Sequence, residues 1–324
     1  MKKSIRTLLS PTKFIIGFCA VFFIILPKIA AGYILSFFFI LFIYVTLAES
    51  FDILTGYTGY INLGHIAFFG IGAYTLGILF SRGVHFYFCL ALSPCAAVLF
   101  AFVVSFPFFR LKGAYFSIAM LALVLLLMKM TINFGSVTGG AYGLLIKSGS
   151  VIMPSYYLAL ILATVTILTH RIIGSSKFGL ALKSIRDDEE VAQVFGINSF
   201  RHKLKTMVIS AAFSGLAGGI YVYQLNYISP QTVFGTSIMF IPSVMALFGG
   251  SGIWTGPLVG TILLTLIDEL IWTKIAYFHL FLHGAILVFI GLFLPQGIVR
   301  SKILKDIYFK LNSLYTTIND SSNT

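Results

Sequence analysis

Residues 56–65, "GYTGYINLGH", combine hydrogen-bonding side chains with glycines inside an apolar stretch. The polar groups that could bond a solute there are Thr58, Asn62 and His65. Three glycines are predicted to break helical regularity around them, namely Gly56, Gly59 and Gly64. At membrane depth, irregular backbone is tolerated only where it is buried in protein or faces a water-filled cavity. The segment therefore predicts either close helix packing or part of a transport passage.

Other patterns that could support chemistry are weaker. His279 and His283 lie four residues apart on one helical face, a spacing that metal ligands can use, with Asp268 and Glu269 near the same edge. We interpret them as interfacial histidines and expect no metal site. The chain has no G-x-x-x-x-G-K-[ST], H-E-x-x-H or G-x-S-x-G motif. We therefore expect no enzyme activity, and any ATP that drives transport must bind a separate subunit.

The composition indicates a membrane protein. Of 324 residues, 58% are hydrophobic and only 10% are charged, whereas soluble domains carry about 25% charged residues. Almost every window long enough to cross a bilayer is apolar. The net charge of +12 is spread over short loops between apolar segments, a distribution typical of membrane orientation rather than of nucleic-acid binding.

We predict an all-α, polytopic integral membrane protein with about ten transmembrane helices. The predicted spans are 14–31, 33–50, 61–80, 86–109, 113–134, 151–169, 206–226, 234–250, 255–273 and 277–295. Ten spans divide into five plus five, and an odd number per half makes the halves an inverted repeat, which is a common transporter plan. The permease domain is expected to cover 1–299, and a basic tail to cover 300–324.

The charge pattern predicts the orientation of the chain. With the N-terminus inside, the inner segments hold 17 of the 22 Lys and Arg residues, so both termini are expected in the cytoplasm. Glu49 and Asp52 are expected to flank an inner turn, which leaves no acidic relay at membrane depth. Such a relay is what a proton-coupled secondary transporter needs. Sodium coupling and a channel stay open as alternatives.

Small residues also recur at helical spacing. Ala67, Gly70, Ala73 and Gly77 fall on one face of a predicted span, and Gly215 belongs to a similar stripe in a later span. In lipid, small residues let helices approach closely. These stripes predict helix contacts. The stretch 135–150 is rich in small residues and is predicted to form a loop or a partly re-entrant turn.

The one long segment that is not apolar is 170–205, on the predicted cytoplasmic side. Asp187 is expected to cap a short helix there, with Glu190 as its capping-box partner, and Gly196 is expected to end it. Its apolar face consists of Val191, Val194 and Phe195. A short amphipathic helix between spans can dock a soluble partner, or it can lie on the protein's own spans or the membrane surface.

"EVAQVFG" (190–196) resembles the E-A-A-x-x-x-G loop by which ABC importer permeases engage their ATPase subunit, although the I-x-L-P continuation is missing. An ordered set of segments extends the resemblance over residues 40–299: "GYTGYINLGHIAFFGIGAY", "LKGAYFSIAMLAL", "VTGGAYGL", "FGLALKSIRDDEEVAQVFGIN", "ISAAFSGLAGGIY", "ISPQTVF", "LFGGSGIWTGPLVG" and "LPQGIV". Together they resemble the LivM-type permeases of branched-chain amino-acid ABC importers. The related urea-importer permeases share most of this pattern.

The resemblance implies roles for individual residues. An ATPase-coupling role is implied for Arg186, Asp187, Asp188, Glu190, Ala192 and Gly196. Pathway or helix-packing roles are implied for Gly56, Gly59, Asn62, Gly64, His65, Gly70 and Gly72. A further small-residue motif of the family is matched by Thr138, Gly139 and Gly140.

The resemblance also implies partners and a location. The expected partners are a homologous second permease subunit, two cytoplasmic ABC ATPase subunits and an extracytoplasmic substrate-binding protein. ATP and magnesium would bind the ATPase subunits, so no cofactor is expected on this chain. Leucine, isoleucine and valine are the implied substrates, with urea or short amides as the alternative and an ion-coupled secondary transporter as a less favoured one. The implied location is the bacterial cytoplasmic (inner) membrane.

Overall fold

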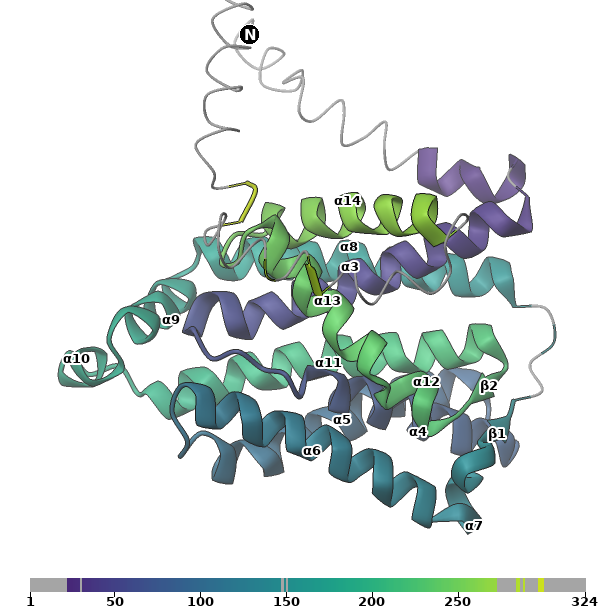
Figure 1. The fold of residues 1–324 in the computed structure, drawn as a ribbon, viewed down its shortest axis with the longest axis horizontal. Helices are drawn as coiled ribbons and strands as arrows, with labels where there is room; N and C mark the ends of the chain where they lie inside the picture. The colour runs from purple at the N-terminus through teal and green to yellow at the C-terminus, as the bar shows by residue number, and fades with distance from the viewer. Residues whose placement is uncertain are drawn as a thin grey trace, which may run out of the picture.

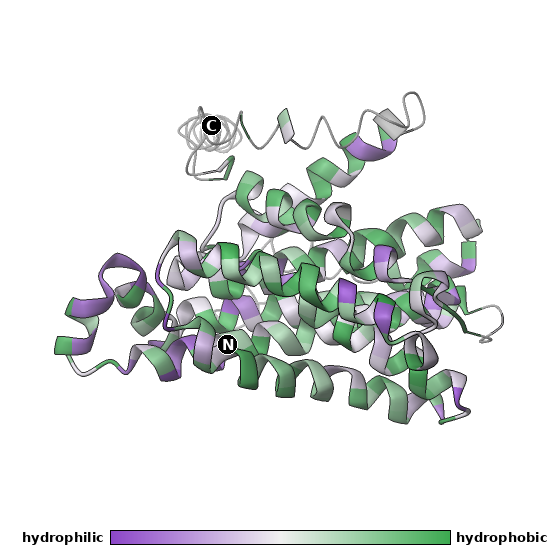
Figure 2. Ribbon diagram, turned by 60° about the horizontal axis from the view of Figure 1, so that its bottom comes forward, coloured by the Kyte–Doolittle hydropathy of each residue, from purple (hydrophilic) through white to green (hydrophobic). Residues whose placement is uncertain are grey.

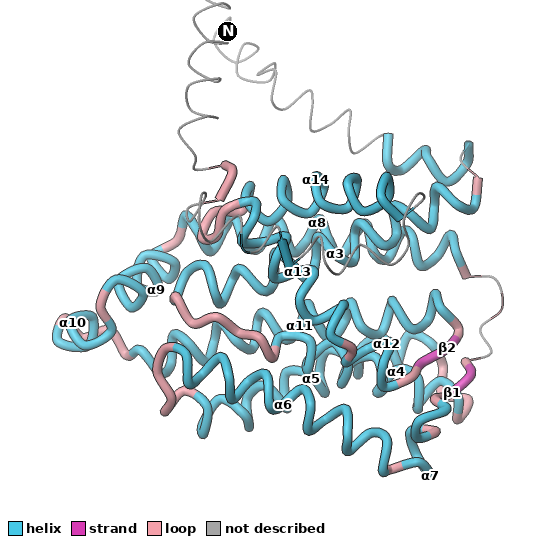
Figure 3. Tube along the Cα trace, viewed as in Figure 1, coloured by secondary structure: helices cyan, strands magenta, loops and turns pink. Residues whose placement is uncertain are grey.

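The computed structural model describes residues 22–29, 31–146, 149, 151–272, 284, 285, 288 and 297–299. Helices dominate this part of the chain (Figure 1, Figure 3). Several expectations concern residues outside it, namely the start of the first span, nearly all of the tenth span, His279, His283 and the tail 300–324.

The elements alternate long helices with short connections. Up to residue 175 they are α3 (Gly32–Thr58), α4 (His65–Ser81), α5 (Phe86–Phe108), α6 (Ala114–Asn133), α7 (Gly135–Thr138), the 3-10 helix η1 (Gly140–Tyr142), β1 (Leu144–Leu145) and α8 (Ile152–Ser175). The later elements are α9 (Lys177–Asp187), α10 (Glu189–Val194), α11 (Ser199–Leu225), β2 (Tyr227–Ile228), α12 (Pro230–Phe234), α13 (Thr236–Gly249) and α14 (Thr255–Trp272).

Six helical stretches in the described residues are long and apolar enough to cross a membrane. They are α3, α5, α6, α8, α11 and the stretch formed by α12 and α13. The helix α4 is apolar but shorter. A helix satisfies its own backbone hydrogen bonds, which lipid cannot do, so apolar segments of this length adopt helices in a bilayer. The chain is therefore built as a polytopic membrane protein.

The helix α3 is longer than the sequence predicts. The expected inner turn at Glu49 and Asp52 is wrong, because the helix continues to Thr58 and both acidic side chains are fully buried in it. Gly56 is helical as well and does not break α3. A buried charge is tolerated when it is paired and hydrogen-bonded, and both acids have such partners on other elements.

The bundle has two distinct ends. The helices α9 and α10 project from one of them, called here the α10 end, and α7, β1 and β2 lie at the other, the β1–β2 end (Figure 1). Hydrophilic residues gather at the α10 end, whereas the helices between the ends are mainly apolar (Figure 2). This separation is what a bilayer imposes on a membrane-spanning bundle.

The helix α11 packs on α4, α5 and α3. Gly72 on α4 lies against Gly215 on α11 so closely that a Cβ atom at Gly72 would overlap the Gly215 carbonyl. The Ser93 hydroxyl on α5 lies 2.7 Å from the Gly72 carbonyl oxygen and 3.0 Å from that of Gly215. This is the close helix approach that small residues permit in lipid.

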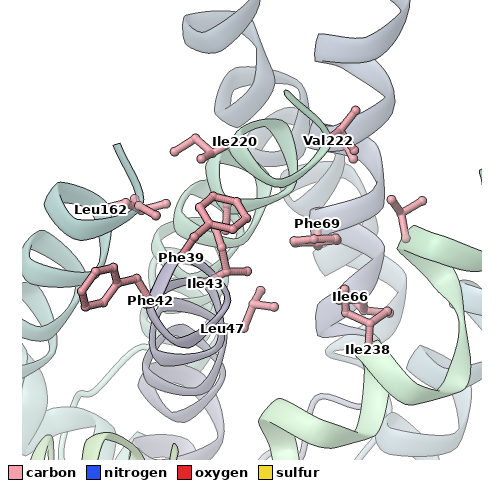
Figure 4. Packing of buried hydrophobic residues seen from close by; sticks show 14 of the residues in the cluster. Phe39, Phe42, Ile43, Leu47, Ile66, Phe69, Leu162, Ile220, Val222 and Ile238 are labelled. Atoms are coloured by element: carbon pink, nitrogen blue, oxygen red, sulfur yellow. The ribbon is translucent and has the colours of Figure 1, made fainter. Parts of the chain in front are cut away.

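A large apolar cluster joins α3, α4, α8, α11 and α13. Figure 4 shows Phe39, Ile43 and Leu47 of α3 projecting from successive turns toward the neighbouring helices. The other members labelled in Figure 4 are Phe42, Ile66, Phe69, Leu162, Ile220, Val222 and Ile238. The shared cluster fixes these helices relative to one another.

At the β1–β2 end, two short segments pair as antiparallel strands, Leu144 opposite Ile228 and Leu145 opposite Tyr227. The pairing joins the connection that follows α6 to the one that follows α11. It is a small exception to the all-helical expectation. Stretch 135–150, predicted as a loop or re-entrant turn, contains α7, η1 and β1.

Candidate functional site

The connection between α3 and α4 is an ordered, half-buried break. Gly59 ends α3 in the left-handed conformation, with φ +76°, and donates its N–H to the Thr55 carbonyl at 2.9 Å. The Asn62 side-chain oxygen accepts the Gly64 N–H at 3.1 Å, and the Asn62 N–H lies 3.3 Å from the Thr55 hydroxyl. The Asn62 side chain is fully buried, and its amide nitrogen has no partner in the described residues.

His65 begins α4 and joins three helices. Its Nε2 lies 3.0 Å from the Ser50 hydroxyl of α3, and its Nδ1 lies 3.3 Å from the Ser210 hydroxyl of α11. The Ser210 hydroxyl also donates to the Ser50 carbonyl at 2.7 Å. His65 is thus a buried cross-link between helices.

The glycines that follow the break make room for neighbouring elements. A Cβ atom at Gly64 would lie 2.6 Å from the Met120 carbonyl oxygen of α6. Gly70 lies against the ring of Phe234 on α12, and Gly72 lies against α11. The predicted pathway residues therefore lie at helix contacts around the break.

Thr138, Gly139 and Gly140 lie at the β1–β2 end, far from α10 (Figure 1). Both glycines have positive φ, +74° and +60°. The Thr138 hydroxyl donates to the Thr131 carbonyl at 2.6 Å and so closes the turn after α6. This motif and the 56–65 segment belong to opposite ends of the bundle.

The start of α10 differs from the prediction. Asp188, not Asp187, is its N-cap, and the Asp188 carboxylate accepts the N–H groups of Glu190 and Val191 at 2.9 and 3.0 Å. Asp187 is the last residue of α9, whereas Asp188 has an extended backbone (φ −158°) that turns its side chain back onto the helix start. The capping box with Glu190 does not form.

The end of α10 agrees with the prediction. Gly196 has φ +85°, its N–H donates to the Gln193 carbonyl at 2.9 Å, and the Ile197 N–H donates to the Ala192 carbonyl at 3.0 Å. This is the Schellman arrangement in which glycine is favoured.

The apolar residues of α10 point away from the bundle, apart from Ala192, which is buried. Val191 is 49% exposed, Val194 85% and Phe195 81%. The helix therefore does not lie on the described spans with this face. A protruding apolar surface at the hydrophilic end of a bundle can bind another protein.

Glu189, which the sequence analysis did not single out, fixes α10 to the bundle. One carboxylate oxygen accepts from the Lys203 ammonium of α11 at 2.7 Å, and the other accepts the Tyr60 hydroxyl at 2.6 Å. The Lys203 side chain is 2% exposed, and its ammonium lies 4.3 Å from the centre of the Tyr60 ring. Burial and the hydrogen bond to Glu189 raise the pKa of Tyr60, so this hydroxyl stays a donor.

The neighbouring Glu190 is placed differently. Its carboxylate pairs with Lys112 at 2.9 Å, and both side chains are mostly exposed. The hydrogen bond that the Lys112 ammonium donates to Glu190 raises the pKa of Lys112, which keeps the pair charged. The sequence contains two adjacent glutamates and several lysines. The spacing of these residues does not indicate which glutamate forms a buried ion pair and which an exposed one.

Arg186 connects α9 to the break after α3. Its guanidinium Nη1 donates to the Gly56 carbonyl at 2.6 Å. A Cβ atom at Gly59 would lie 3.2 Å from the Arg186 side chain, and one at Gly252 would lie 3.0 Å from its guanidinium. Arg186 therefore lies where the 170–205 segment, the 56–65 segment and the α13–α14 connection meet.

A buried cluster of titratable side chains lies beside this junction. Nδ1 of His170 on α8 lies 2.5 Å from a Glu49 carboxylate oxygen, and its Nε2 lies 3.6 Å from one of Asp52. Asp52 also accepts the Gly252 N–H at 2.8 Å and the Ser251 hydroxyl. Two acidic side chains are therefore buried within the bundle rather than at a turn, so the argument against ion coupling that rested on the turn does not hold.

Residues 33–291 match the family described as "Branched-chain amino acid transport system / permease component". The chain belongs to this family. The resemblance drawn from the ordered motifs is thereby confirmed. Permease components of this kind are transport subunits of ABC transporters and not enzymes.

Individual relatives agree with this membership. The permease is 26% identical over 289 residues to the high-affinity branched-chain amino acid transport permease LivM of Escherichia coli, covering 79% of this chain and 68% of the relative. It is 25% identical over 241 residues to a probable LivM of Methanocaldococcus jannaschii, covering 66% and 69%. The autoinducer 2 import permease LsrC of Yersinia enterocolitica is 26% identical over 152 residues, covering 45% and 42%. No solved structure matches the chain.

Proposed function

We propose that this permease carries branched-chain amino acids through the bacterial cytoplasmic membrane in an ATP-driven importer. An extracytoplasmic binding protein delivers the substrate, and a homologous second permease completes the passage. The LivM relatives support the substrate, because they are named as permeases for branched-chain amino-acid transport.

Two cytoplasmic ATPase subunits dock on this chain and its partner. The observation that carries this assignment is the helix α10, which ends in the exposed Val194 and Phe195 while Glu189 binds it to Lys203 of α11. Arg186 binds the preceding helix, α9, to the end of α3. In this proposal Asp187, Asp188, Glu190, Ala192 and Gly196 shape the docking helix. ATP binding then biases the two access states through its differential affinity for them.

The permease domain covers 1–299, with ten spans in an inverted five-plus-five arrangement and the tail 300–324 in the cytoplasm. Both termini lie on the side of α10. The excess of Lys and Arg in the predicted inner segments supports this orientation.

The glycine-rich segments serve as moving contacts beside the passage. Gly59, Asn62 and Gly64 lie in the break, between Gly56 near the end of α3 and His65 at the start of α4. Arg186 donates to the Gly56 carbonyl, so motion of α9 and α10 reaches the spans there. The helix contacts at Gly70 and Gly72 support the break. Thr138, Gly139 and Gly140 close the opposite end.

Uptake of radiolabelled leucine and urea tests this function, in cells with and without the gene and before and after ATP depletion. We expect gene-dependent leucine uptake that stops when ATP is depleted. ATP-dependent uptake of urea without uptake of leucine would mean that the substrate is urea and that the ABC mechanism stands. Gene-dependent uptake that survives ATP depletion with ion gradients intact would refute the coupling proposal and favour an ion-coupled transporter, for which Glu49, Asp52 and His170 would be the buried relay.

A further inference from the structure

A cavity of about 460 Å³ lies between α3, α6, α11, α12 and α13. Its volume is within the range of small-molecule sites in proteins. Its lining residues are Tyr44, Leu125, Met128, Tyr221, Gln231, Thr232, Phe234, Gly235, Thr236, Ile238 and Met239. None of them carries a charge.

One part of the wall is apolar and closely packed. Phe234 and Met239 are almost fully buried. The Phe234 ring fills the space that Gly70 leaves and stacks on Tyr74 with ring centres 6.1 Å apart. Leu125 on α6 borders the cavity from the exposed side. This wall suits an aliphatic side chain, because apolar contact is what it offers to a ligand.

The rest of the lining offers hydrogen bonds. Tyr44 and Tyr221 contribute two phenol side chains to the lining, and Gln231, which also lines the cavity, is exposed. The Thr232 hydroxyl, by contrast, is used in the capping box of α12 with Ser229. Two phenols and one amide can therefore bind the polar end of a ligand.

The charges around the cavity select among ligands. None of the lining residues that the structure describes is charged, and Asp268 of α14 lies near enough to act electrostatically on Tyr44. An anionic ligand would lose water here without gaining a counter-ion from the described lining, and Asp268 would repel it, which is costly. Urea has no apolar part for the wall to contact. An aliphatic amino acid is neutral overall, and both of its charged groups have a partner here. Its side chain can contact the apolar wall, its carboxylate can accept the phenol hydroxyls, and its ammonium is attracted by Asp268.

Resting on the proposed import function, we infer that this cavity is the point on this chain where an aliphatic amino acid binds during translocation. Its side chain contacts Leu125, Phe234 and Met239, and its polar head faces Tyr44 and Tyr221. The cavity lies where the helix breaks between α12 and α13 at Gly235. Broken helices form substrate sites in many transporters.

Filling the cavity is the first test. Leu125→Trp places an indole at its exposed side, and Leu126→Trp is the matched control, because Leu126 is the next residue of α6, is 55% exposed against 49% for Leu125, and does not line the cavity. In cells that contain the complete transporter, we expect Leu125→Trp to lower radiolabelled leucine uptake more than about tenfold. Leu126→Trp should leave it unchanged at equal membrane abundance.

Two further variants change the ligand contacts without blocking the cavity. Removing both phenol hydroxyls in Tyr44→Phe/Tyr221→Phe should raise the KM for leucine about tenfold or more, as expected for lost hydrogen bonds. Met239→Ala removes part of the apolar wall and enlarges the cavity, so it should shift uptake from leucine toward phenylalanine. A purely structural role of Met239 would not change this selectivity.

The outcomes separate the two proposals. If the wild-type transporter takes up no leucine, the proposed function fails. If it takes up leucine and Leu125→Trp matches Leu126→Trp, with KM and selectivity unchanged in the other variants, the cavity assignment is wrong and the proposed function stands. Copurification of the ATPase subunits with each variant confirms that the complex assembled.

Discussion

The two sides of α10 differ in their contacts: one side is bound to the bundle and the other is exposed. Toward the bundle, Glu189 pairs with Lys203 and Tyr60, and the Lys203 side chain is buried. Toward the outside, Val194 and Phe195 are among the most exposed apolar residues of the described chain. A helix that is bound firmly on one side and open on the other can pass a partner's movement to the spans.

The adjacent residues Glu189 and Glu190 show the same contrast between a buried contact and an exposed one. The distances are similar, 2.7 Å for Glu189 to Lys203 and 2.9 Å for Glu190 to Lys112. Burial differs, and Glu189 has the Tyr60 hydroxyl as a second partner. An exposed pair contributes little because water and salt screen it, whereas breaking a buried pair leaves a charge that water cannot reach.

The largest effect is expected at the buried pair. Lys203→Met leaves the Glu189 carboxylate without its counter-ion and should cost about 3–5 kcal/mol in the free energy of unfolding. Thermal unfolding of the purified complex measures the loss, and leucine uptake should fall with it. The reversed pair Glu189→Lys/Lys203→Glu should recover part of the stability. Equal stability of Lys203→Met and the wild type would show that the pair does not hold α10.

The next effect is expected where α9 meets the break. Gly59→Leu places leucine in the left-handed backbone conformation, which residues other than glycine rarely adopt. It also brings a Cβ atom to 3.2 Å from the Arg186 side chain. We expect uptake to fall more than about tenfold while the protein still inserts. Gly83→Leu is the control, because Gly83 has φ +84° with open space around it. If both variants transport equally, contact with Arg186 does not matter.

A third prediction concerns the open side. Val194→Asp/Phe195→Asp should abolish copurification of the ATPase subunits without changing the thermal unfolding of the permease, because both side chains already face water. Leu180→Asp on α9, also exposed, is the comparison variant. Copurification at the wild-type level would mean that the ATPase binds elsewhere.

The smallest effect is expected at the exposed pair. Glu190→Ala and Lys112→Ala should leave the thermal unfolding midpoint unchanged, singly and together, because both side chains are solvated. Glu190→Arg should still weaken ATPase binding, since it reverses a charge beside the docking face. A clear loss of stability in Glu190→Ala would show that the exposed pair stabilises the protein as the buried pair does.

Sequence reasoning succeeded where one local rule decides the structure. Gly196 ends α10 as expected because only glycine enters the left-handed region cheaply. The predicted N-cap of α10 was wrong by one residue. Asp187 and Asp188 are equally good caps by residue type, and α9, which ends at Asp187, leaves Asp188 for this position. Glu49 and Asp52 were misplaced because their partners Ser251, Gly252 and His170 are more than one hundred residues away.

Composition and charge distribution alone determined that this protein is a helical, polytopic membrane protein, because a bilayer forces long apolar segments to satisfy their own backbone. The ordered motifs determined its family. Only the tertiary structure decided which of two adjacent glutamates is buried, which glycines contact another helix, and where a cavity opens between α6 and α12. Those outcomes depend on contacts between segments far apart in the chain, and such contacts leave no periodic signal in a single sequence.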